Sequence, residues 1–322
     1  MNTGPNSIDP PTLLRPRRSI TGMSAILLPF LANGDVDWNG FDRHVERTFS
    51  AGLMPAVNMD TGYANLISNA LRTEVLRRTK SIASDRNYVA GTFVADGPGA
   101  PFDSKSYQRG ASDIVNNGGT PIVFQSFGLT SLPDDAVPDA YSKITVDCKS
   151  FLAFELGTMF APFGKIYSLE VYEQLMRLPA CRGAKHSSLS RSLEWRRIEL
   201  RNRVRPEFMV LTGNDLAIDM VIYGSDYLLG LSTFAPEAFS RRDRMWRDGD
   251  ERFYELNDLL QYLGALAFRD PVPAYKHSAA MFLNLRYGLA TDHTHPKSPT
   301  RPSSDRELLS LINDSLNLLL ES

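Results

Sequence analysis

Short apolar runs that alternate with helix-like segments dominate residues 19–235 and strongly restrict how the chain can fold. After the first run, for example, Phe41, Val45 and Phe49 recur on one face of a helix. The runs occupy residues 20–28, 53–59, 88–94, 121–127, 151–156, 181–187, 208–211 and 227–231. Repeated strand–helix units imply a parallel sheet. Eight of them in about 215 residues favour a closed (β/α)8 TIM barrel over an open doubly wound sheet.

The two ends of the chain lack this alternation. Residues 1–18 contain four prolines and are expected to form an irregular arm. From Pro236 onward the strand pattern is absent, and helix patterns cover residues 237–247, 250–268, 274–289 and 304–320. We therefore expect a barrel over 19–235 and a C-terminal helical region over 236–322. The leucine-rich stripes of that region predict either a surface for self-association or a cap on the barrel.

Charge and cysteine content exclude several classes of protein. Lysine and arginine number 35 against 37 acidic residues, so no basic field is available to hold a nucleic-acid backbone. No uninterrupted apolar run of about 18 residues predicts a membrane helix, and the first 18 residues hold no apolar signal segment. Cys148 and Cys181 give no disulfide framework. We expect a cytoplasmic protein that binds neither nucleic acid nor membrane.

Lys185 is the most informative candidate for chemistry. Functional groups of a parallel barrel gather at the carboxyl ends of its strands, and Lys185 lies late in the mostly uncharged run 181–187. Burial disfavours a charged ammonium group and lowers its pKa. A neutral lysine can then attack a carbonyl carbon and form an imine. The alternative is a lysine that only reaches solvent from the end of its strand.

Several short segments, in order, resemble the dihydrodipicolinate synthase and N-acetylneuraminate lyase family of class I aldolases. Gly183-Ala184-Lys185 resembles the segment that carries the Schiff-base lysine of that family. The resemblance extends over about residues 19–290, and its other segments are residues 28–30, 33–37, 212–215, 223–225, 230–232 and 271–276. It implies a TIM barrel in which Lys185 forms an imine with a 2-oxo acid or related small carbonyl substrate. It also implies a homo-oligomer, a tetramer or dimer, that needs no metal or organic cofactor.

The sequence departs from this family at two functional positions. The turn after the second strand, which in the family grips a substrate carboxylate, retains Thr61 and Gly62 but carries Asp60, which would repel a carboxylate. Asp60 would instead fit a substrate with hydroxyl or amino groups. The relay tyrosine that the family commonly has at the end of the fifth strand is missing. Glu155 is our predicted replacement as proton shuttle, with a salt-bridged strand carboxylate as the equal alternative.

The remaining candidates lie at other strand ends. Gln125, Gly213, Asp215 and Ser232 join Asp60, Thr61 and Gly62 as expected substrate-binding residues. Asp215 could instead cap the following helix. His186 is expected to face the outer helices if Lys185 faces the lumen, because neighbouring strand residues point to opposite faces.

Two functions follow from these observations. The first is a class I lyase in which Lys185 makes or breaks a C–C or C–O bond through an imine, with Glu155 moving protons. The second is a barrel that has lost catalysis and serves as a ligand-binding or scaffold protein. The missing tyrosine favours the second function, and the retained lysine favours the first.

Overall fold

Eight parallel strands close into a single barrel in this computed structural model, which describes residues 8–321. Each strand is hydrogen-bonded to the next in sequence, and β8 pairs with β1. The strands are β1 (Gly22–Ala25), β2 (Met54–Val57), β3 (Val89–Thr92), β4 (Thr120–Val123), β5 (Phe151–Leu156), β6 (Cys181–Ser187), β7 (Met209–Thr212) and β8 (Asp226–Leu229). The predicted TIM barrel is confirmed. Residues 1–7 of the expected N-terminal arm lie outside the described residues.

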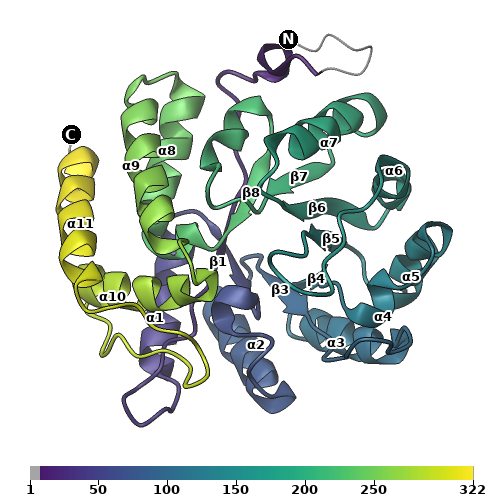
Figure 1. Cartoon of the computed structure of the whole chain (residues 1–322), viewed down its shortest axis with the longest axis horizontal. Helices are drawn as coiled ribbons and strands as arrows, with labels where there is room; N and C mark the ends of the chain where they lie inside the picture. Colours follow the sequence, from purple (N-terminus) through teal and green to yellow (C-terminus); the bar gives the residue numbers. More distant parts are fainter. Residues whose placement is uncertain (1–7, 322) are drawn as a thin grey trace.

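Helices surround the strands and form the outer layer of the barrel (Figure 1). They are α1 (Trp38–Ser50), α2 (Asn69–Ala83), α3 (Ser104–Asn116), α4 (Phe127–Thr130), α5 (Val137–Ile144), α6 (Leu169–Arg177), α7 (Arg191–Val204) and α8 (Pro236–Asp248). Between β7 and β8 the chain forms the short 3-10 helix η4 (Ile218–Tyr223) in place of an α-helix. No side chain caps its start, and Gly224, with a φ of 110°, ends it.

Polar caps fix where several of these helices begin. The Asp37 carboxylate accepts a hydrogen bond from the Gly40 amide at the start of α1. Ser168 and Ser190 cap α6 and α7 in the same way. Each cap satisfies an amide that has no partner within its helix. These caps orient the helices that follow β1, β5 and β6.

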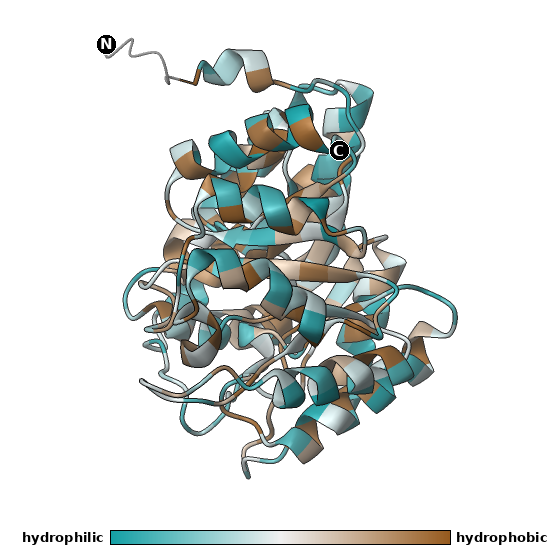
Figure 2. Ribbon diagram, turned by 90° about the vertical axis from the view of Figure 1, so that its right-hand side faces the viewer, coloured by the Kyte–Doolittle hydropathy of each residue, from teal (hydrophilic) through white to brown (hydrophobic). Residues whose placement is uncertain are grey.

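The period-two alternation of the strands decides which side chains enter the barrel. Phe154 on β5 is in register with Lys185 on β6, and Glu155 with His186. Phe154 packs among the apolar residues of the lumen, whereas Glu155 and His186 face the surrounding helices. Figure 2 shows hydrophobic residues along the central strands and hydrophilic residues concentrated on the helices around them. Lys185 therefore points inward, and its neighbour His186 points outward, as predicted.

The C-terminal helices α9 (Arg252–Ala267), α10 (Tyr275–Tyr287) and α11 (Asp305–Glu321) pack beside the barrel, with α11 against both α9 and α10. Leu309, Ile312 and Leu316 form the buried face of α11. Leu308 and Leu311 of the same leucine-rich helix are exposed. Within residues 8–321, no helix has both the length and the apolar character that a membrane span requires.

Candidate active site

A cavity of about 250 Å³ lies at the carboxyl end of the barrel and contains the predicted lysine. Strand ends and the residues that follow them form its floor, and the segment that leads into α10 forms part of its wall. The cavity brings together five of the predicted site residues, which are Asp60, Thr61, Lys185, Gly213 and Asp215. The structure therefore assembles groups that lie far apart in the sequence.

The Lys185 side chain runs along Gly213 into this cavity. A methyl group on Gly213 would lie 2.6 Å from Cε of Lys185 and would also collide with Oγ of Ser187. Glycine at this position is thus what allows the lysine to reach the cavity. The amine ends 4.7 Å from the centroid of the Phe154 ring. Among residues 8–321, no carboxylate forms an ion pair with it.

The surroundings of Lys185 shift its amine toward the neutral form. Burial lowers its pKa, and the negative charges of Asp215 and Asp60 oppose this effect only in part. Asp215 shares the same cavity, and burial raises the pKa of its carboxyl group to about 6. One oxygen of Asp215 accepts a hydrogen bond from the Leu231 amide at 2.7 Å. Asp215 does not cap the next helix, which begins after Ala217 without a side-chain cap; its carboxylate instead bonds the first amide of a later 3-10 helix, η5 (Leu231–Thr233), and lines the cavity.

Asp60 is held by two residues of the C-terminal region. Its carboxylate accepts hydrogen bonds from the Tyr275 hydroxyl at 2.9 Å and from the buried Lys276 amine at 3.0 Å. Partial desolvation in the cavity would raise the pKa of Asp60, whose side chain stays 58% exposed, but the Lys276 charge and the hydrogen bonds from Lys276 and Tyr275 together lower that pKa. Asp60 is therefore a carboxylate whose charge is already matched by a lysine of the protein itself.

Thr61 and Tyr275 extend this contact into a short hydrogen-bonded chain. Their hydroxyl oxygens lie 2.8 Å apart, and both residues line the cavity. Gly62, predicted beside them, does not line it, and a Cβ there would lie 3.2 Å from the Ile26 carbonyl oxygen. Tyr275 and Lys276 were not predicted as site residues, although they belong to segment 271–276 of the family resemblance.

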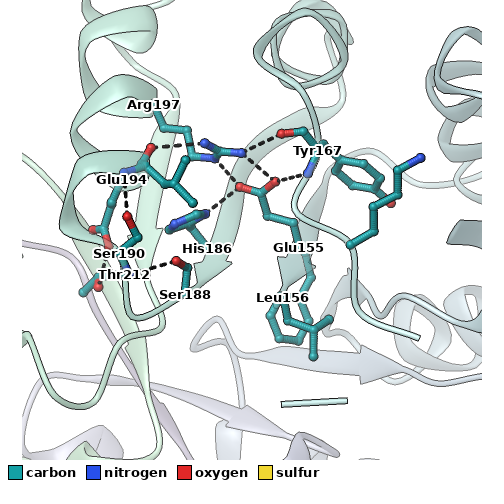
Figure 3. Close-up of polar contacts among 12 residues, drawn as sticks. Glu155, Leu156, Tyr167, His186, Ser188, Ser190, Glu194, Arg197 and Thr212 are labelled. Carbon is teal, nitrogen blue, oxygen red and sulfur yellow. Dashed lines mark hydrogen bonds and ion pairs between the residues drawn. The ribbon is translucent and has the colours of Figure 1, made fainter. Parts of the chain in front are cut away.

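Glu155 lies outside the cavity, in a buried ionic cluster between the barrel and the outer helices (Figure 3). Its carboxylate accepts hydrogen bonds from Arg197, from Nδ1 of His186 at 2.7 Å and from the Tyr167 amide at 2.9 Å. Burial would raise the pKa of Glu155, but the Arg197 charge and the hydrogen bonds from His186 and Arg197 together lower it. We do not retain the predicted proton shuttle, because Glu155 and Lys185 point to opposite faces of the sheet. The alternative of a salt-bridged strand carboxylate describes this position.

Gln125 and Ser232 are also structural neighbours of the cavity and do not line it. Gln125 donates to the Lys165 carbonyl at 2.7 Å and accepts from the Lys165 amide at 3.0 Å. It thereby fastens the loop that follows β5. Ser232 is buried and donates to the Leu229 carbonyl at 2.9 Å. Neither side chain has a free path to a molecule beside Lys185.

Two further observations describe the chemistry available at the site. Aromatic rings cover much of the cavity wall, from Phe93, Phe124, Phe154, Phe160, Phe163, Phe268 and Tyr275. Over the described part of the chain, no group of three or more histidine, cysteine, aspartate or glutamate side chains is arranged to hold a metal ion.

Comparison with solved structures identifies the same fold in known enzymes. The dihydrodipicolinate synthase of Thermotoga maritima aligns with a TM-score of 0.76 at 17% identity, over 94% of this chain and 100% of that chain. A prophage protein of the dihydrodipicolinic acid synthase family from E. coli K12, in complex with pyruvate, gives 0.79 at 15% identity, over 92% and 99%.

The sialic acid aldolase of Ruminococcus gnavus gives a TM-score of 0.78 at 15% identity, over 94% of this chain and 98% of that chain. A catalytic lysine mutant of that aldolase also matches, with a TM-score of 0.77. No family model matches the sequence, and no curated protein matches it. The likeness to these structures confirms the family resemblance at the level of the fold.

Proposed function

We propose that the protein is a class I lyase in which Lys185 forms an imine with a small carbonyl substrate. The observation that carries the proposal is the Lys185 amine, which ends without an ion pair in a cavity at the carboxyl end of the barrel and whose pKa burial lowers. The catalytic lysine of the Ruminococcus gnavus aldolase, a protein of the same fold, supports this role. Family resemblance implies 2-oxo acids as the substrate class.

Imine formation needs a neutral amine and a path for protons. The amine of Lys185 adds to the carbonyl carbon, and the resulting carbinolamine loses water to give the imine. The protonated imine then accepts the electron pair of a neighbouring C–C or C–O bond when that bond breaks. Asp215, with a pKa of about 6, is suited to donate or accept a proton in the cavity near neutral pH.

Tyr275 takes the place of the missing relay tyrosine in this proposal. Burial raises the pKa of its phenol well above the ordinary value, so the hydroxyl keeps its proton. A proton can pass from the Thr61 hydroxyl to Tyr275 and from Tyr275 to the Asp60 carboxylate, over distances of 2.8 and 2.9 Å. The Asp60 side chain is 58% exposed, which gives this chain of groups an outlet to solvent.

Chemical trapping tests the proposal. The protein is incubated with a panel of carbonyl compounds and borohydride, which reduces any imine to a stable secondary amine, and the intact mass is then measured. We expect a single adduct that maps to Lys185 and disappears in Lys185→Ala. The exposed Lys149→Ala serves as the matched control and should leave the adduct unchanged. Absence of an adduct across the panel would instead favour the binding or scaffold protein.

We also propose that the chain self-associates and works in the cytoplasm. Exposed leucines on α11, among them Leu311 at 60% and Leu318 at 71% exposure, support an apolar surface for self-association. Light scattering should then give a mass of at least two chains, and Leu311→Glu with Leu318→Glu should lower it. A monomer at micromolar concentration would contradict the proposal.

A further inference from the structure

Aromatic side chains form much of the lining of the cavity that contains Lys185. Phe124 and Phe154 meet edge to face with centroids 5.0 Å apart, and Phe268 stacks on Tyr275 at 4.3 Å. Met59, Leu156 and Val272 add further apolar surface. An apolar cavity of roughly 150 Å³ is large enough to hold benzene. The cavity beside Lys185, at about 250 Å³, thus has both the size and the lining for an aromatic ring.

The charges of the cavity oppose a substrate carboxylate. Within the described chain, Lys185 is the one basic side chain that lines the cavity, and imine formation consumes its amine. Two carboxyl groups, Asp60 and Asp215, line the same space. Lys276 is nearby, but both oxygens of Asp60 hold its amine at 3.0 Å. Apart from the protonated imine itself, a carboxylate bound here would find no unpaired cation in the cavity lining, and it would lie beside the carboxyl group of Asp215.

Several hydrogen-bond donors of the turn after β2 are engaged within the protein. The amides of Gly62 and Ala64 donate to the Met59 carbonyl at 3.0 and 3.2 Å, and the Tyr63 amide donates to the Asp60 carbonyl at 2.8 Å. The Thr61 hydroxyl is bonded to Tyr275. The turn that the family resemblance assigns to a substrate carboxylate therefore makes these bonds within the protein.

We propose that the substrate of Lys185 is a neutral carbonyl compound with an aromatic or other apolar body, and not a 2-oxo acid. The inference rests on the proposed imine function and specifies its substrate class. The apolar body lies against the phenylalanine wall, and the carbonyl carbon meets the lysine amine. The side of the carbonyl that faces Asp60 and Asp215 carries no negative charge.

Four ketones that differ in only two properties test this inference. Acetone and phenylacetone are neutral, and pyruvate and phenylpyruvate replace one methyl group by a carboxylate. Within each pair, one member carries a phenyl ring and the other does not. The wild-type protein is incubated with each ketone and borohydride, and the Lys185 adduct is quantified by peptide mass analysis as a function of ketone concentration.

We expect phenylacetone to label Lys185 at a concentration at least tenfold lower than either acetone or phenylpyruvate requires. Equal or better labelling by pyruvate or phenylpyruvate than by their neutral counterparts would overturn the inference and leave the imine function intact. Absence of a Lys185 adduct with all four ketones would overturn the imine function itself, so the two failures are distinguishable.

Phe160 allows a second measurement with little risk to folding. Its ring lines the cavity and is 38% exposed, on the loop after β5. Phe160→Ala should raise the half-saturating concentration of phenylacetone several-fold and leave that of acetone unchanged. Tyr254→Ala, which removes a 57% exposed ring from α9, is the matched control and should change neither value. Unchanged phenylacetone labelling in Phe160→Ala would contradict the role of the aromatic wall.

Discussion

Substituting Gly213 by alanine should displace the Lys185 side chain without removing it. The variant therefore tests whether the position of this lysine matters for adduct formation. The added methyl group would lie 2.6 Å from Cε of the lysine, whereas ordinary carbon–carbon contacts lie between 3.4 and 4 Å. The lysine or the β7 end must therefore move by roughly 1 Å. A misplacement of about 1 Å can reduce the rate of a reaction about 100-fold, which corresponds to about 2.7 kcal/mol of transition-state stabilisation.

The assay is the rate of borohydride-trapped adduct at Lys185, measured beside the free energy of unfolding in denaturant. For Gly213→Ala we expect a rate about 100-fold lower and a free energy of unfolding about 1–3 kcal/mol lower, because the methyl group overfills a packed site. Gly97→Ala is the matched control, since its Cβ would meet nothing within 4 Å. If Gly213→Ala forms the adduct at the wild-type rate, the packing of this glycine does not position the lysine.

Three other substitutions test the groups around the site. Tyr275→Phe should slow adduct formation at Lys185 about 100-fold with the fold retained, as loss of a general acid–base group does, and an unchanged rate would exclude the relay. Glu155→Gln should lower the free energy of unfolding by about 3 kcal/mol through loss of the buried Arg197 pair, while folded protein keeps its trapping rate; a lost rate at full stability would restore Glu155 as a shuttle. Asp215→Asn tests how the raised pKa of Asp215 makes stability depend on pH. Because burial raises this pKa from 3.8 to about 6, the carboxyl group contributes to the free energy of unfolding below pH 4, and this contribution is lost as pH rises through 6. The free energy of unfolding of Asp215→Asn should therefore gain up to roughly 3 kcal/mol relative to wild type over that range, and parallel pH profiles would contradict the raised pKa.

The barrel and its lysine were predictable because both depend on short-range patterns. Apolar runs alternate with helical periodicity along the whole barrel, and period-two alternation places His186 opposite Lys185. Glu155 shows the limit of that reasoning. Its direction depends on the register of β5 against β6, where it pairs with His186 and not with Lys185. The sequence of one strand does not specify its register against the next.

Contacts between distant segments were the other part that the sequence could not supply. Asp60 and Lys276 form an ion pair across 216 positions of the chain, and no local pattern connects them. The sequence predicts that Asp60 repels carboxylates, but it does not identify the cation that forms an ion pair with Asp60. Gln125 and Ser232 were misplaced for a related reason, because lying near a strand end does not decide whether a side chain enters the cavity.

The bonds from Tyr275 and Lys276 to Asp60 have a consequence for biosynthesis. Tyr275 and Lys276 are synthesised more than two hundred residues after Asp60, the residue to which they bond. Tyr275 also supplies part of the cavity wall. A nascent chain that has completed β8 contains Lys185 but lacks part of the wall of the cavity around it. Premature termination before residue 275 would thus leave the cavity open on one side and Asp60 without its two partners, so the cavity is complete only when the last helices dock.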